Sequence, residues 1–114
     1  MKRLLLPAMS VALLAAGCVG PDPELQTRAV SEFQVGHVTE AKVLFQQALD
    51  RYPCDPEALY YMGRIAHAQG AYEDAVYYFQ CCLDADPAYA DAYGWLARSE
   101  QAAGSAGRLL RFIP

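Results

Sequence analysis

The sequence lacks a long apolar segment and is poor in basic residues. Its longest apolar run, residues 4–16, covers roughly 13 residues, whereas a membrane-spanning helix needs about 20. The 114 residues carry 9 basic and 13 acidic side chains, which gives a formal net charge of −4. Nucleic-acid binding requires clustered basic side chains, so we expect no nucleic-acid partner.

Residues with catalytic or metal-binding chemistry are also few. The chain has 4 cysteines and 2 histidines, and it contains neither the Cys-x-x-Cys or His spacing of zinc sites nor the Cys-x-x-Cys-His haem motif. His37 and His67 have no Ser or Cys partner at a suggestive spacing. The acidic residues are scattered, without the paired pattern suited to general acid–base catalysis. We therefore predict no enzymatic activity, no metal and no cofactor.

The N-terminal segment has the organisation of a signal peptide. Lys2 and Arg3 precede the apolar run, which ends in small residues before Cys18. The end Ala15-Ala16-Gly17-Cys18 resembles the bacterial lipobox, although that motif prefers leucine where this chain has Ala15. The resemblance implies a lipoprotein signal peptide at residues 1–17, lipidation of Cys18 and a lipidated tether at residues 18–23. The alternative is an ordinary signal peptide that contains a cysteine.

A lipidated Cys18 would hold the protein stably on a membrane, because several acyl chains bind far more tightly than one. No acidic residue follows Cys18 directly, and the resemblance then favours the outer membrane, with the protein facing the periplasm. Removal of Lys2 and Arg3 leaves 7 basic and 13 acidic residues, a net charge of −6. An acidic body of this kind disfavours broad contact with anionic lipid headgroups. We expect the lipid alone to attach the protein to the envelope.

Residues 24–114 repeat with a period of 34 residues, as the glycines at 36, 70 and 104 illustrate. Alignment of residues 22–55 with 56–89 gives eight identities, where composition alone would give about two. The identical pairs are Leu25/Leu59, Gly36/Gly70, Ala41/Ala75, Phe45/Phe79, Gln46/Gln80, Leu49/Leu83, Asp50/Asp84 and Pro53/Pro87. A 34-residue period with Ala, Phe and Pro at fixed places resembles the tetratricopeptide repeat family. The resemblance covers nearly all of the chain after the signal peptide.

This resemblance implies an all-α fold, a solenoid of antiparallel helix pairs with two full repeats and a capping helix. The repeats are residues 22–55 and 56–89, with a partial third at 90–114. Gly36 and Gly70 are predicted to end the first helix of each pair with a positive φ, and Gly104 marks the same turn in the third unit. The second helix of that third unit is cut to two turns at most.

The resemblance further implies that the first helices line a concave binding groove. The predicted lining residues are Gln26, Val30 and Phe33 in the first unit, Tyr60, Arg64 and His67 in the second, and Gly94, Arg98 and Gln101 in the third. The lysines and asparagines with which the family clamps chaperone tails are absent. Arg64 and Arg98 should lie one above the other and bind a carboxylate. The alternative is that they pair with local acids, namely Glu57, Asp91 or Glu100.

The thiols and the C-terminus support two further hypotheses. Cys82 occupies a small core position, and Cys54 could form a disulfide with Cys81 or Cys82 in an oxidising compartment. Leu109, Leu110, Phe112 and Ile113 form an apolar patch that either folds back or docks on another chain.

The favoured function is a lipid-anchored adaptor or assembly factor that binds a protein or peptide partner in a pilus, secretion or envelope complex. The alternatives are a thiol-active or metal-binding periplasmic protein that uses Cys54, Cys81 or Cys82, and a self-associating structural subunit.

Overall fold

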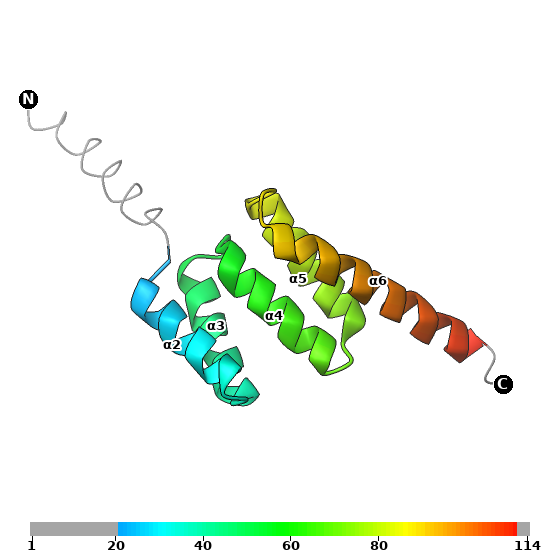
Figure 1. Cartoon of the computed structure of the whole chain (residues 1–114), viewed down its shortest axis with the longest axis horizontal. Coiled ribbons are helices and arrows are strands. Elements are labelled where there is room, and N and C mark those ends of the chain that lie inside the picture. The colour runs from blue at the N-terminus through cyan, green and yellow to red at the C-terminus, as the bar shows by residue number, and fades with distance from the viewer. Residues whose placement is uncertain (1–20, 112–114) are drawn as a thin grey trace, which may run out of the picture.

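The computed structural model describes residues 21–111, and it describes side chains as far as residue 105. The described residues form helices and no strand, and consecutive helices pack against one another along the chain (Figure 1). The helices are α2 (Pro23–Gln34), α3 (Val38–Arg51), α4 (Pro56–Ala68), α5 (Tyr72–Ala85) and α6 (Ala90–Arg111). The predicted all-α solenoid of helix pairs with a capping helix is confirmed. None of these helices is both long and apolar enough to cross a membrane.

Each repeat begins with the same capping chemistry. Asp22 and Asp55 are the N-caps of α2 and α4, and each is followed by a proline in the first turn. The Oδ1 atom of Asp55 accepts the backbone N–H groups of Glu57 and Ala58 at 3.1 and 3.4 Å. These bonds satisfy donors that the first turn of a helix leaves without partners. The local sequence Asp-Pro-Glu thus determines where both first helices start.

Glycine closes the turn inside each pair. Gly36 and Gly70 have φ values of 91° and 79°, a region that side chains disfavour. The N–H of Ala71 donates to the carbonyl of Ala66 at 2.9 Å, which satisfies a carbonyl at the end of α4. The prediction for these two turns is confirmed.

The predicted turn at Gly104 is wrong. Gly104 lies inside α6, which runs without interruption for 22 residues to Arg111. The expected short second helix of the third unit is therefore absent from the described residues. A glycine inside a helix costs only about 1 kcal/mol relative to alanine. A turn at Gly104 would avoid this cost, but no second helix of the third unit packs against α6 to stabilise such a turn among the described residues.

The core lies between the helix pairs. Ala41 and Ala75 are fully buried, as are Phe45 and Phe79, in agreement with the sequence prediction. Burial of each phenylalanine contributes about 1.5–3 kcal/mol. Gly63 of α4 lies directly against Phe79, because a Cβ atom at this position would be 2.7 Å from the ring. In the second pair, α5 therefore inserts the Phe79 ring at the place where α4 has no side chain.

Candidate functional site

The first helices α2, α4 and α6 contribute side chains to one continuous surface, which we call the first-helix face. At its centre the guanidinium carbon of Arg64 lies 5.0 Å from the ring centroid of Phe33 and 4.8 Å from that of Trp95. The guanidinium carbon of Arg98 lies 5.1 Å from the Trp95 ring. Phe33, Arg64, Trp95 and Arg98 together are called the aromatic–arginine stack. It crosses all three first helices, and cation–π attraction stabilises each of its contacts.

The two arginines of the stack make no ion pair with any acidic residue that the structure describes. Among the described residues the ion pairs lie elsewhere, so neither Arg64 nor Arg98 has a carboxylate within salt-bridge distance. The alternative in which they pair with Glu57, Asp91 or Glu100 is therefore wrong. The Nε atom of Arg64 is buried and makes no hydrogen bond. An unsatisfied buried donor costs about 1–3 kcal/mol, which offsets part of the stabilisation that Arg64 gains from the rings.

Two predicted groove residues belong to the interior. Tyr60 is only 6% exposed and packs on Tyr89 with ring centroids 5.0 Å apart, and its ring lies 5.7 Å from the guanidinium carbon of Arg64, so it supports that arginine from the interior. Gln26 is half-buried and donates from Nε2 to Oδ2 of Asp55. Burial raises the pKa of the Asp55 carboxyl above its usual range, although hydrogen bonds from Ala58 and Gln26 oppose the rise. Gln26 and Asp55 join the first repeat to the second.

His67 has a partner that its sequence neighbours did not reveal. Its Nδ1 atom lies 3.0 Å from Oγ of Ser99, on α6. The ring also meets Tyr72 and Trp95 edge to face, at 5.1 and 5.3 Å. Ser99 is fully buried, so its hydroxyl cannot meet a substrate. The pair therefore serves as a link between α4 and α6.

The remaining predicted residues lie at the margins of the first-helix face. Val30 is half-buried and packs against the core, whereas Gly94 and Gln101 are exposed on α6. Trp95 was not among the predicted groove residues, yet it stacks on both arginines. It is the single tryptophan of the chain and lies three residues before Arg98, or just under one helical turn. That spacing was the signal that could have identified it.

The tetratricopeptide repeat family matches residues 27–90, which is more than half of the chain. The chain belongs to this family. The matched segment runs from the first turns of α2 to the start of α6 and includes Phe33 and Arg64. Tetratricopeptide repeats generally mediate protein–protein interactions and are generally not catalytic. No curated protein matches the chain as a relative.

The three described thiols of this tetratricopeptide repeat protein are free. Cys54 is exposed, Cys81 is half-buried and Cys82 is buried, and the disulfide that Cys54 could form with either of the other two is not present. Burial, together with the negative charges of Asp86 and Asp55, raises the pKa of Cys82 to about 12. A thiol that stays protonated at neutral pH is a poor nucleophile. In residues 21–111, no three His, Cys, Asp or Glu side chains gather closely enough to hold a metal ion.

The predicted lipidation site and C-terminal patch extend outside the described structure. Cys18, Phe112 and Ile113 lie outside the described residues, and Leu109 and Leu110 belong to the part of α6 without described side chains. The helical backbone of α6 does include positions 109 and 110.

Proposed function

We propose that this chain is a lipid-anchored adaptor that holds an acidic segment of a partner protein on its first-helix face at the bacterial envelope. The observation that carries the proposal is the pair of arginines, Arg64 and Arg98, stacked on Trp95 without any acidic partner in the described chain. Family membership supports the general role in protein binding.

The geometry of the stack favours a carboxylate as the recognised group. Aromatic rings lie about 5 Å from the guanidinium carbons, and the N–H donors of a guanidinium lie in its plane, at the edge. Those donors match a carboxylate in a bidentate arrangement. Both guanidinium carbons lie near one ring centroid, so they are at most about 10 Å apart, the usual spacing of packed helices. Two acidic side chains at positions i and i+2 of an extended segment, about 7 Å apart, fit this separation.

The test removes the two arginines together. A photo-crosslinking amino acid at Gln101, exposed beside the stack, captures the partner from membranes of cells that make the protein. Arg64→Ala with Arg98→Ala should weaken partner binding by more than about 2 kcal/mol, about thirtyfold, while the helical content stays unchanged. The matched control is Arg51→Ala, which removes an exposed arginine of α3 that pairs with Asp22. Two results would refute the role of this face: crosslinking of the partner to the double variant at the parent level, or an equal loss of crosslinking in the Arg51→Ala control.

The anchor is proposed from the sequence at Cys18 and has a separate test. The exported protein should carry added lipid mass and partition into detergent, whereas Cys18→Ala should remain uncleaved or become soluble. Cell fractionation should place the parent protein in the outer membrane, facing the periplasm. A parent protein that stays in the aqueous phase, without added mass, would exclude the anchor but leave the binding face unaffected.

A further inference from the structure

A pair of acids repeats with the same period as the two arginines of the stack. Glu57 and Asp91 are 34 positions apart, as Arg64 and Arg98 are, and each acid precedes its arginine by seven residues. Seven residues are close to two helical turns, so an acid and its arginine lie on the same side of their helix, about 10 Å apart along it. We call Glu57 and Asp91 the acid row, and Arg64 and Arg98 the arginine row. The first-helix face therefore has two rows of opposite charge.

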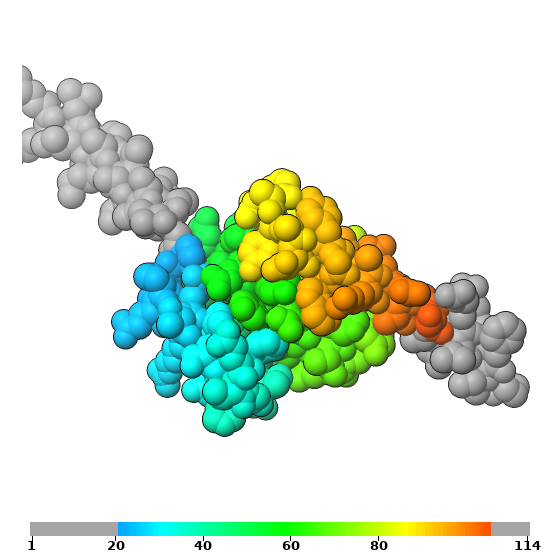
Figure 2. Space-filling model, in the orientation of Figure 1, coloured from blue at the N-terminus to red at the C-terminus, as the bar shows by residue number. Residues whose placement is uncertain are grey.

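The fold aligns the two rows. Arg64 of α4 lies over the ring of Trp95 in α6, and His67, about one turn later, lies against Ser99, also about one turn later. The two helices therefore run in the same direction (Figure 1), and their N-terminal ends, with the acid row, lie at one side of the face. In the space-filling view, α4 is uncovered between α2 and the first half of α6, so a segment of another protein can reach it (Figure 2).

The acid row has no basic partner among the described residues. The ion pairs of the described chain join other groups, and neither Glu57 nor Asp91 takes part in one. Tyr61 lies near both rows, because burial and then the charge of Glu57 raise its pKa, while the charge of Arg64 opposes the rise. Burial, together with the charge of Asp55, also raises the pKa of the Glu57 carboxyl. A cation bound beside Glu57 would therefore compensate a charge that the described chain leaves unpaired.

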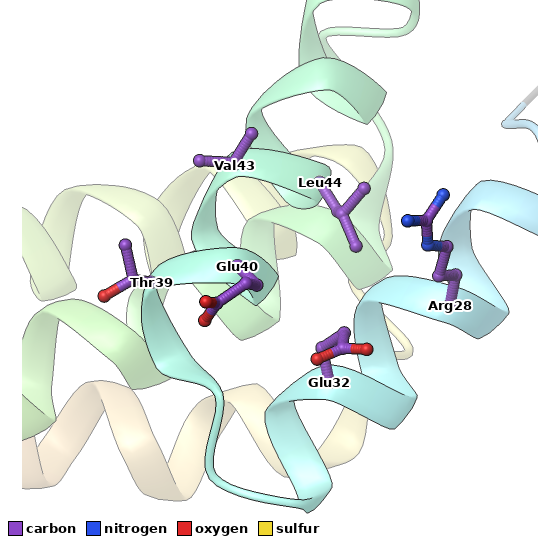
Figure 3. Close-up of a pocket in the computed structure, with 6 residues that line it drawn as sticks. All are labelled: Arg28, Glu32, Thr39, Glu40, Val43 and Leu44. Atoms are coloured by element: carbon purple, nitrogen blue, oxygen red, sulfur yellow. The ribbon is translucent and has the colours of Figure 1, made fainter.

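The helix dipole alone does not distinguish the acid row. Both of its members lie in the first turn of a helix, where acids are favourable, but Glu40 and Glu73 have the same place in α3 and α5. Glu40 lines a separate hollow between α2 and α3 (Figure 3). The described lining of that hollow has one arginine, Arg28, and no aromatic ring. The acid row differs from these acids because it lies parallel to the arginine row, in which the Nε atom of Arg64 is buried without a hydrogen bond.

We propose that the partner segment is extended and alternates acidic and basic side chains, with the acidic ones on the arginine row and the basic ones on the acid row. Successive side chains of an extended segment point to opposite sides, so positions i and i+2 meet one row and positions i+1 and i+3 meet the other. Each such pair spans about 7 Å, and the two members of a row belong to helices about 8–10 Å apart, a difference that long side chains bridge. The acid row repels a segment that is acidic throughout, and this repulsion gives specificity. The inference rests on the proposed function, because the arginine row must bind the acidic side chains.

The test measures the binding of three blocked hexapeptides by NMR titration. Residues 19–114 are used, because they contain every described helix and all core contacts. The alternating peptide is acetyl-Ala-Glu-Lys-Glu-Lys-Ala-amide, and the block peptide, acetyl-Ala-Glu-Glu-Lys-Lys-Ala-amide, has the same composition and net charge. The serine peptide, acetyl-Ala-Glu-Ser-Glu-Ser-Ala-amide, keeps the two acids without the basic residues. The alternating peptide should bind about tenfold or more tightly than either of the others.

Glu57→Gln with Asp91→Asn removes the acid row. This double variant should bind the alternating peptide about tenfold more weakly and the serine peptide more tightly, because it no longer repels the two negative charges. The matched control is Glu40→Gln with Glu73→Gln, which removes two charges from the first turns of α3 and α5. The control should bind each peptide like the parent. Circular dichroism should show the same helical content in all variants.

Arg64→Ala with Arg98→Ala separates this inference from the proposed function. Loss of both the alternating and the serine peptide in this variant supports the proposed function. Equal affinities of the parent for the alternating and block peptides, or equal effects of the acid-row variant and its control, would overturn the inference and leave the proposed function standing. Binding of the alternating peptide at the parent level without the two arginines would overturn both. A parent protein that binds none of the three peptides would overturn the inference.

Discussion

The contact between Gly63 and Phe79 tests the packing of the helix pair, and we expect Gly63→Ala to destabilise the protein. An added Cβ atom would meet three carbons of the Phe79 ring at 2.7, 2.8 and 2.9 Å. Real Cβ atoms essentially never approach so closely. Phe79 is fully buried and also stacks on Trp95, so its ring has no free space into which it can move. Either α4 and α5 move apart or the ring leaves its preferred rotamer.

The size of the effect follows from two opposing contributions. Overpacking of a core costs about 1–3 kcal/mol. Alanine in place of a helical glycine returns about 1 kcal/mol. Gly63→Ala should therefore lower the free energy of unfolding by about 0–2 kcal/mol. The control is Gly94→Ala in α6, where nothing lies within 4 Å of the added atom. That variant should gain about 0.5–1 kcal/mol.

Urea unfolding, followed by circular dichroism, measures both variants on residues 19–114. Helix propensity cancels in the comparison, so a difference of about 1–3 kcal/mol isolates the contact with the ring. The thermal midpoints should differ by at least about 4 °C. In a double-mutant cycle, Phe79→Leu should cost less in the Gly63→Ala background than in the parent, because the smaller side chain relieves the clash. Equal stabilisation by both glycine substitutions would refute the packing argument.

Two further predictions concern titratable groups. The raised pKa of Asp55 means that its folded form binds the proton more readily, so its contribution to stability is largest at low pH and is lost as the pH rises. The stability of the parent relative to Asp55→Asn, which keeps a good N-cap, should therefore fall in urea titrations as the pH rises above about 4, the ordinary pKa of the carboxyl. Parallel profiles would contradict this. Iodoacetamide at pH 8 should label exposed Cys54 within minutes while Cys82, with a pKa near 12, reacts only in denaturant. Mass spectrometry that finds both thiols labelled at equal rates would show that the core around Cys82 opens freely.

The helix pairs could be predicted because the same chemistry appears twice at one spacing. Gly36 and Gly70 each precede a helix whose alanine and phenylalanine are buried in the core. The turn that the glycine favours and the packing of the following helix therefore support the same structure. Gly104 has the same spacing but lacks that second helix, and its neighbours Ala102 and Ala103 favour helix. A glycine permits a turn, but packing of the following segment decides whether the turn forms.

The centre of the site could be predicted only in part. Arg64 and Arg98 followed from the repeat period, since equivalent positions of successive first helices lie side by side. The contacts that define their chemistry do not obey that period. Trp95 lies 31 residues after Arg64, and His67 meets Ser99 across 32 residues. Such contacts depend on how neighbouring helices are rotated and on side-chain length, which a single sequence does not determine.

The energetics of Arg64 connect the fold to the proposed function. Its contacts with Phe33 and Trp95 stabilise it by about 0.5–2 kcal/mol each. Burial of its Nε without a partner costs about 1–3 kcal/mol and offsets part of that stabilisation. An apolar residue such as methionine would fill the same space between the rings without that cost. We propose that the value of this charge, in a chain with excess acid, lies in what it binds. Three rings surround the guanidinium group of Arg64 and restrict its motion, so part of the ordering entropy is lost before a carboxylate arrives.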